Sequence, residues 1–174
     1  MDEAELSRAF PIGDGACLEA VIARYGQALR YCHHILCDYH EAQDAVQDAL
    51  LRAWSRRDRF RAGTNLEAWL YKLAYHACID LLRQRRRQLF APPPPSGYNP
   101  DYIGPELRAA LSVLTLEERG LVFGRVMEGR SYEELSQIYG PSAAALRKRY
   151  ERARKKLALA LSESELDEQK EVVP

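Results

Sequence analysis

Aromatic and cationic residues alternate through the second quarter of the chain. Phe60, Trp69, Tyr71 and Tyr75 lie among basic residues of the same segment. Aromatic rings can stack on unpaired bases while cations hold the phosphate backbone, so this composition is typical of a surface that binds single-stranded nucleic acid. Some of the rings can instead belong to a core, and we interpret Trp69 as a core residue. The cations are Arg56, Arg57, Arg59, Arg61, Lys72, Arg83, Arg85, Arg86 and Arg87.

A second cationic segment, residues 131–156, has the proportions of a helix-turn-helix. Ser131 and Glu134 have the spacing of a capping box, Gly140 can end a helix in a left-handed conformation, and Ser142 can cap the next one. In such a motif the N-terminal half of the second helix enters the major groove, where arginine binds guanine edges. A plain helical hairpin is the alternative. The exposed candidates are Ser142, Arg147, Lys148, Glu151 and Arg152, with Arg149, Arg154 and Lys155 on phosphates or in packing.

Acidic residues gather on one face of a predicted helix nearer the N-terminus. Asp44 and Asp48 are four residues apart, Gln47 lies between them, and Glu41 precedes them. Like charges at this spacing destabilise a helix slightly, so their presence favours a basic protein partner. A merely solvated face is the alternative.

The cysteines and histidines between Cys32 and His40 raise the hypothesis of a metal site. Successive helical residues diverge by about 100°, so Cys32, His33 and His34 cannot all converge on one ion. Cys32 also falls on an apolar stripe, where cysteine behaves as a small hydrophobe. We therefore expect no metal and no cofactor; metal binding or redox sensing is the alternative. The sequence also has no phosphate-binding glycine loop and no nucleophile–base signature, so we expect no enzymatic activity.

Helical periodicity must position these residues, and it predicts an all-α protein of two small helical domains. Apolar residues recur at three- and four-residue steps, with a break at 63–65, and strand-like alternation is absent. Four consecutive prolines, 92–95, cannot continue a helix and mark a linker. The expected helices span 18–36, 42–54, 66–81, 107–114, 117–127, 132–139 and 142 to about 161. The expected domains are 1–88 and 105–161, with a Pro-rich linker at 89–104 and an acidic tail at 162–174.

Charge is distributed in blocks although the 174 residues have a formal net charge of zero. Residues 1–48 hold nine acidic and three basic residues, whereas 52–87 hold three acidic and ten basic ones. A basic block is the usual electrostatic footprint of a polyanion partner, although charge runs can also be solvated helix faces. The N-terminus has no signal-like segment and no stretch reaches about 18 apolar residues, so we expect a soluble cytoplasmic protein with reduced thiols.

Taken in order, these segments resemble the extracytoplasmic-function (ECF, group IV) sigma factors of bacterial RNA polymerase. Residues 41–54, Glu-Ala-Gln-Asp-Ala-Val-Gln-Asp-Ala-Leu-Leu-Arg-Ala-Trp, resemble the helix that binds core polymerase. Residues 60–71 and 80–87 are similar to the promoter-melting and minus-10 region. The resemblance to the minus-35-binding domain lies in 114–119, 129–136 and 147–154. Together the resemblance covers about residues 18–160.

The resemblance implies an alternative sigma subunit that directs core RNA polymerase to promoters. It allows an anti-sigma factor as a further partner and implies no membrane insertion. The implied site residues are Asp44, Gln47 and Asp48 for core polymerase; Phe60, Arg61, Asn65, Arg83, Arg85, Arg86 and Arg87 for the single-stranded non-template strand at the minus-10 element; and Ser142, Arg147, Lys148, Arg149, Glu151, Arg152, Arg154 and Lys155 for the duplex minus-35 element.

Several residues depart from the family pattern. Gln43 stands where an acid is common, Thr115 replaces the usual proline, Ala145 replaces a threonine, and Lys148 stands where serine is frequent. Promoter preference is therefore not carried over.

Two other classes of function remain open. A helix-turn-helix regulator that is not a polymerase subunit would explain residues 131–156 but would leave 41–87 without a role. A protein of partner-switching regulation would bind a regulator without supporting transcription.

Overall fold

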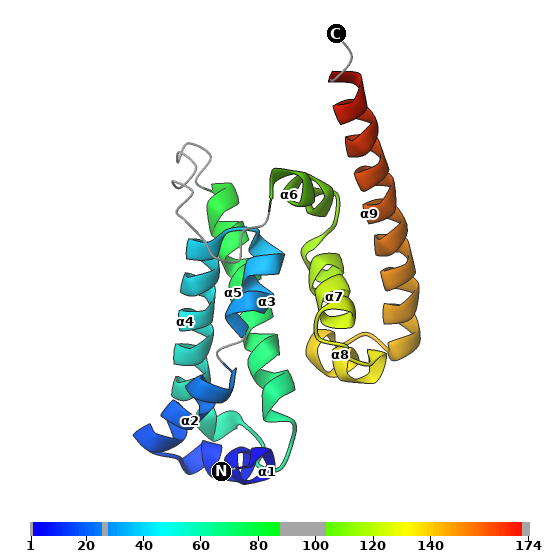
Figure 1. The fold of residues 1–174 in the computed structure, drawn as a ribbon. Helices are drawn as coiled ribbons and strands as arrows, with labels where there is room; N and C mark the ends of the chain where they lie inside the picture. Colours follow the sequence, from blue (N-terminus) through cyan, green and yellow to red (C-terminus); the bar gives the residue numbers. More distant parts are fainter. Residues whose placement is uncertain (1, 26–27, 88–103, 172–174) are drawn as a thin grey trace. The chain divides into compact units, whose positions relative to one another are not determined.

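The structure is a computed structural model that describes residues 2–25, 28–87 and 104–171 (Figure 1). All regular elements in these ranges are helices, which confirms the predicted fold class. The chain divides into two compact units, Met1–Pro95 and Ser96–Pro174. Except for Gly104, the predicted linker lies outside the described residues.

The first unit begins with a short helix that the periodicity did not predict. Helix α1 (Glu3–Ala9) starts at a capping box between Asp2 and Glu5, and a 3₁₀ turn, η1 (Phe10–Ile12), follows it. Leu6 and Phe10 are buried in a cluster formed with residues of the later helices: Cys17, Val21, Ala53, Phe60, Leu66 and Leu70. The N-terminal segment is thus part of the core.

The single helix expected over 18–36 is wrong. The structure has two helices there, α2 (Gly15–Tyr25) and α3 (Ala28–Leu36), and the intervening Gly26 and Gln27 lie outside the described residues. The apolar spacing runs through both helices, but it does not mark one buried face, because Ile22 is 44% exposed. Periodicity alone could not detect two helices that share a similar spacing.

Two long helices form the centre of the first unit. Helix α4 (Tyr39–Ser55) packs against α3 and α5 (Leu66–Arg87), and a short 3₁₀ turn, η2 (Arg57–Arg59), follows α4. The residues of α4 that are buried are all small, namely Ala42, Ala45, Ala49 and Ala53. These small side chains allow α4 to pack closely against its neighbouring helices.

The second unit consists of four described helices. They are α6 (Pro105–Ser112), α7 (Leu116–Val126), α8 (Tyr132–Tyr139) and α9 (Ala143–Glu171). Leu121, Leu135 and Leu146, one from each of the last three helices, form its buried centre. The helices expected after the linker are confirmed, with Thr115 and Ser131 as N-caps whose capping boxes include Glu118 and Glu134.

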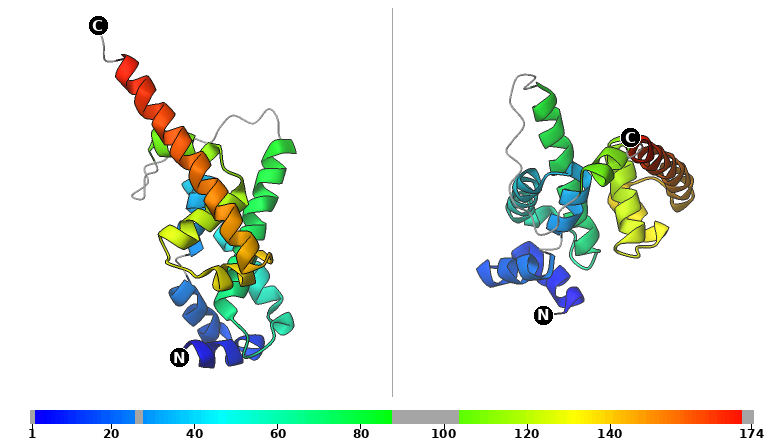
Figure 2. Two further views of the ribbon diagram at one scale, coloured as in Figure 1. Left: turned by 90° about the vertical axis from the view of Figure 1, so that its right-hand side faces the viewer. Right: turned by 45° about the horizontal axis from the view of Figure 1, so that its top comes forward.

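Helix α9 is ten residues longer than expected. It continues through most of the predicted acidic tail to Glu171 and extends beyond α6, α7 and α8 (Figures 1 and 2). Residues 162–171 contain neither glycine nor proline and are rich in helix-forming residues, so nothing in the sequence ends the helix at Leu161.

Candidate nucleic-acid interface

The second unit contains a helix-turn-helix in which local hydrogen bonds fix both helix starts. At α8, the Glu134 amide donates to Ser131 Oγ at 3.1 Å and the Ser131 amide donates to Glu134 Oε2 at 2.7 Å. Gly140 ends α8 with φ of +98°, a conformation that L side chains rarely adopt. The Ala145 amide then donates to Ser142 Oγ at 3.3 Å. Ser142 therefore caps α9 and is also exposed at its start.

Ion pairs divide the cations of α9 into two groups. Arg149 pairs with Glu117 of α7, and Lys156 pairs with Glu118 of α7 at 2.8 Å. Arg154 pairs with Glu151 on α9 itself at 3.1 Å. Arg149 and Lys156 thus help to hold α9 against α7, which is the packing role that the sequence left open for Arg149.

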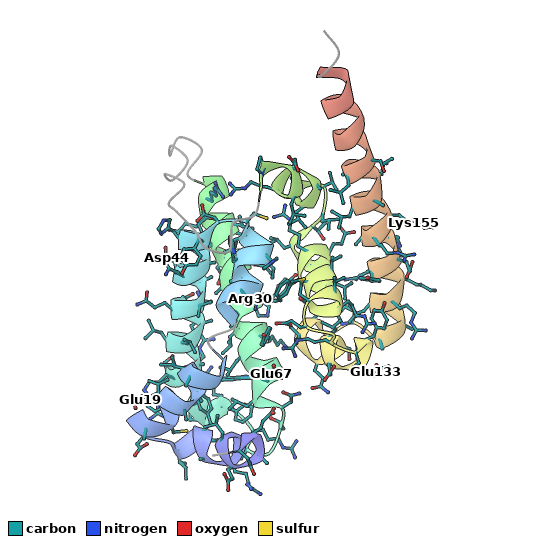
Figure 3. The ribbon with its side chains drawn as sticks, viewed as in Figure 1. Glu19, Arg30, Asp44, Glu67, Glu133 and Lys155 are labelled. Carbon is teal, nitrogen blue, oxygen red and sulfur yellow. The ribbon has the colours of Figure 1, made fainter. Side chains whose placement is uncertain are left out.

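The remaining cations of this segment form an exposed stripe. Lys148, Arg152 and Lys155 are spaced four and three residues apart, so they share one face of the helix. The described residues place no carboxylate against any of the three. Figure 3 shows Lys155 on the side of α9 away from α7. We call Lys148, Arg152 and Lys155 the basic stripe.

Arg147 differs from both groups because it contacts an aromatic ring. Its guanidinium carbon lies 5.3 Å from the centre of the Tyr132 ring, at the start of α8. Arg125 of α7 lies 4.7 Å from the centre of the same ring. The sequence did not predict Tyr132 or Arg125 as functional residues, because only the packing of α7, α8 and α9 brings them to Arg147.

In the first unit, the residues predicted to bind unpaired bases occupy different environments. Arg61 and Asn65 are exposed, but Phe60 is only 4% exposed and packs against Phe10 and Trp69 at ring-centre distances of 5.9 and 5.3 Å. Phe60 therefore belongs to the core of this unit, and its predicted part in binding unpaired bases stays a prediction. Trp69 is partly buried against the same cluster, as interpreted from the sequence.

The turn between Arg61 and Asn65 is held by hydrogen bonds at both ends. The Thr64 carbonyl accepts from the Ser7 hydroxyl at 2.6 Å, and the Thr64 hydroxyl donates to the Arg61 carbonyl at 2.7 Å. Asn65 Oδ1 accepts from the Ala68 amide at 2.8 Å, so Asn65 caps α5. Gly63 has φ of +78°, which fits its place in the turn.

The arginines at the end of α5 are only partly available. Arg83 is exposed and lies 3.9 Å from Asp80, whereas Arg85 pairs with Glu41 of α4 at 3.3 Å. The side chains of Arg86 and Arg87 lie outside the described residues.

The acidic face of α4 is less uniform than its sequence indicates. Asp44 and Gln47 are exposed, and Figure 3 shows Asp44 on the side of α4 away from α3. Asp48 instead binds Arg52 through both carboxylate oxygens, at 3.0 and 2.6 Å, and Arg52 also binds Asp80 of α5 at 2.8 Å. These hydrogen bonds, first to Asp80 and then to Asp48, raise the pKa of Arg52. The two carboxylates therefore differ in availability.

The cysteines of the described segments lie in the interior. Cys17, Cys32, Cys37 and Cys78 are all buried free thiols. A hydrogen bond with Cys32, together with burial, raises the pKa of the Cys78 thiol, which disfavours the reactive thiolate. Within the described ranges, no group of three or more cysteine, histidine or acidic residues is placed to hold a metal ion. None of the helices described combines the length and apolarity needed to cross a membrane.

Comparison with known proteins identifies the class of protein to which the chain is similar. Residues 21–88, which include α3, α4 and α5, match Sigma-70 region 2. The fold of the solved sigma factor RpoE from Bartonella quintana, in complex with the anti-sigma factor NepR, matches with a TM-score of 0.66 at 25% identity, covering 83% of this chain and 95% of that one. The chain thus resembles sigma factors in sequence and fold.

The curated relatives then identify the family. The chain is 34% identical over 128 residues to the ECF RNA polymerase sigma factor EcfG of Rhodopseudomonas palustris, covering 69% of this chain and 71% of that protein. It is 27% identical over 162 residues to the ECF RNA polymerase sigma factor SigE of Mycolicibacterium smegmatis, covering 83% of this chain and 63% of that protein. This chain belongs to the ECF RNA polymerase sigma factors.

Proposed function

We propose that this protein is a non-catalytic sigma subunit that binds core RNA polymerase in the cytoplasm and directs it to specific promoters. The observation that carries the proposal is the basic stripe of α9, an exposed cationic face on the second helix of a helix-turn-helix. Family membership supplies the polymerase as the partner, because the relatives are RNA polymerase sigma factors.

For the duplex minus-35 element, we propose that Arg152 and Arg147 read base edges and that Lys148 and Lys155 contact phosphates. Arginine can donate two parallel hydrogen bonds to guanine, whereas lysine acts as a point charge. Ser142 lies at the start of α9, where its exposed hydroxyl can reach the phosphate backbone of DNA. Arg149, Glu151 and Arg154 serve mainly to hold the helix, because their charges are engaged in ion pairs.

For the minus-10 element, we propose that unpaired bases meet the exposed turn between Arg61 and Asn65. Arg61 supplies the cation, and Phe60 fixes the start of the turn from within the core. Arg83 is exposed and is proposed to contact the DNA phosphate backbone. The resemblance of residues 80–87 to the minus-10 region assigns Arg86 and Arg87 to the same contact. Arg85 is proposed to join them only when it leaves Glu41, because one guanidinium at 3.3 Å from a carboxylate is already engaged.

For core polymerase, we propose that Asp44 and Gln47 make the first contact and that Asp48 contributes through its pairing with Arg52. Asp44 is exposed, so a basic partner can approach it without breaking an existing ion pair of α4 with α5. We also propose an anti-sigma factor as a partner, on the ground that the similar RpoE was solved in complex with one.

Neither nucleic-acid contact needs to be tight alone. Two binding units on one chain gain from effective concentration, because the second contact becomes intramolecular once the first has formed. A helix-turn-helix regulator that is not a polymerase subunit is less favoured, because residues 21–88 match Sigma-70 region 2.

Run-off transcription tests the proposal. Purified core RNA polymerase, this protein and DNA fragments from upstream of its own gene are combined, with core polymerase alone as the control. A discrete transcript that requires the protein is the expected result. DNA binding without any transcript that depends on the protein would instead favour the regulator.

A further inference from the structure

Among the cations of α9 whose side chains the structure describes, Arg147 is the one held against an aromatic ring. The neighbouring Arg149 and Arg154 pair with glutamates, and the basic stripe faces solvent. Arg147 is exposed, yet its guanidinium lies over the Tyr132 ring at 5.3 Å, within the range of a cation–π contact.

The ring of Tyr132 is itself fixed from several sides. Tyr132 is the first residue of α8 and directly follows the capping box of Ser131 and Glu134. Its side chain packs against the buried Leu121–Leu135–Leu146 cluster and meets the Tyr150 ring edge-on, with 6.2 Å between ring centres. The ring is therefore a rigid support that belongs to the first helix of the helix-turn-helix.

Arg125 attaches this support to the turn before α8. Its guanidinium lies 4.7 Å from the ring centre and donates a hydrogen bond to the Arg130 carbonyl. Residues of α7, α8 and α9 thus meet at one ring, although Arg125 and Arg147 lie far apart in the sequence.

A ring restricts an arginine without consuming its hydrogen-bond donors. A cation–π contact attracts the guanidinium to the ring without pairing it with a carboxylate, so N–H donors stay available to a base edge. A free arginine side chain loses rotamer freedom when it binds, and a side chain that is already restricted loses less. The contact with the Tyr132 ring therefore favours DNA binding by Arg147 in the orientation in which the ring holds it.

We propose that Tyr132 is a positioning residue for promoter recognition, whose ring holds the Arg147 guanidinium in the orientation in which α9 presents it to duplex DNA. The inference rests on the proposed binding of the minus-35 element by α9. Tyr132 itself contacts no base; it acts through Arg147.

The test is a double-mutant cycle read out as base preference. Holoenzyme formed from core RNA polymerase and the full chain selects from a duplex DNA library randomised over the upstream element. The variants are Tyr132→Leu, Arg147→Ala and the two combined, with Tyr132→Phe as the conservative variant. Tyr139→Leu is the matched control, because Tyr139 also lies on α8 and packs against the same cluster. Thermal unfolding of each variant records any loss of folding.

We expect Tyr132→Leu to weaken preference at the same base pair as Arg147→Ala, by about two- to fivefold, which is the strength of an exposed cation–π contact. The double variant should be no weaker there than Arg147→Ala alone, and Tyr132→Phe should keep most of the preference. Additive effects, an unchanged profile in Tyr132→Leu, or the same loss in Tyr139→Leu would overturn the inference. If the wild-type holoenzyme selects no upstream sequence, the proposed minus-35 role fails first, and the inference fails with it.

Discussion

Pairing decides which cations of α9 are available to DNA. Lys155 and Lys156 are adjacent and both exposed, and Lys156 has a carboxylate partner at 2.8 Å in α7, whereas no described carboxylate lies against Lys155. A cation that is already paired releases fewer counterions when it meets a phosphate, because its charge is partly neutralised. The two lysines therefore form a matched pair for measuring DNA contacts.

We expect Lys155→Ala to reduce the slope of log binding constant against log salt by about 1, as for one lost phosphate contact. Lys156→Ala should change the slope by less. Arg147→Ala and Arg152→Ala should each cost about 1–3 kcal/mol of binding free energy and relax specificity at single base pairs. Titrations of holoenzyme with promoter DNA at several salt concentrations measure the slopes and the binding free energies. Equal slopes for the two lysine variants would contradict the assignment of Lys155 to a phosphate contact.

Asn65 combines two roles that one conservative substitution can separate. Its side chain caps α5 by accepting from the Ala68 amide, and it is also exposed in the turn proposed to meet unpaired bases. Aspartate caps a helix as well as asparagine does, but its charge opposes a nearby phosphate.

At the scale of the element, Asn65→Ala should therefore lower the free energy of unfolding of the first unit by about 0.5–2 kcal/mol. Asn65→Asp should keep that stability and weaken promoter melting. Chemical unfolding followed by the fluorescence of Trp54 and Trp69, both in this unit, measures the first effect, and permanganate footprinting measures the second. If Asn65→Asp melts promoters as well as the wild type does, Asn65 has only the capping role.

Capping boxes also make the second unit sensitive to acid. Hydrogen bonds from the Ser131 amide and hydroxyl lower the pKa of Glu134. Burial would raise the pKa of Glu118, but hydrogen bonds from Lys156 and Thr115 lower it overall. Both carboxyls thus have folded pKa values below the ordinary 4.5. Their contribution to stability is complete above that value and is lost as the pH falls through the lowered folded values.

We therefore expect the stability of the second unit to decline as the pH is lowered from about 5 to 3. Glu134→Gln should be less stable than the wild type at pH 7 and should lose less on acidification, because the titrating carboxyl is gone. Urea unfolding at several pH values, followed by NMR signals of this unit, measures the difference. Parallel stability curves for the two proteins would contradict this origin of the acid sensitivity.

At the scale of the whole molecule, the two units are proposed to bind different partners, and their functions should be separable. Asp44 is exposed on α4, whereas Asp48 belongs to an ion-pair chain that continues through Arg52 to Asp80 on α5. Charge reversal at these positions has different structural consequences, although both reversals oppose a basic partner.

Asp44→Lys should weaken binding of core polymerase and leave the unfolding temperature unchanged. Asp48→Lys should weaken binding and also lower the unfolding temperature, because it removes one of the two carboxylate partners of Arg52 and places a like charge beside it. Neither change should alter the binding of minus-35 DNA by the second unit. Titration of labelled polymerase with each variant, together with thermal unfolding, tests these predictions. Full polymerase binding by Asp44→Lys would show that Asp44 is not part of the interface.

The sequence by itself determined most of the helices and the helix-turn-helix. Their starts and ends depend on contacts within a few residues, such as Ser131 with Glu134, Ser142 with Ala145 and the positive φ of Gly140. Apolar spacing likewise identified the buried faces of α4 and α5, because the helical period is a local property of the chain. It failed over 18–36, where two helices share one spacing, and it missed α1, which is too short to show a period.

Tertiary structure alone decided which candidate side chains are free. The pairs Arg52–Asp80, Arg149–Glu117 and Arg85–Glu41 join residues 28, 32 and 44 positions apart, and no local pattern encodes such separations. Packing likewise placed Phe60 in the core beside Phe10 and brought Tyr132 under Arg147. Helix formation is governed by neighbours in the chain, whereas the availability of a charge depends on which helices pack together.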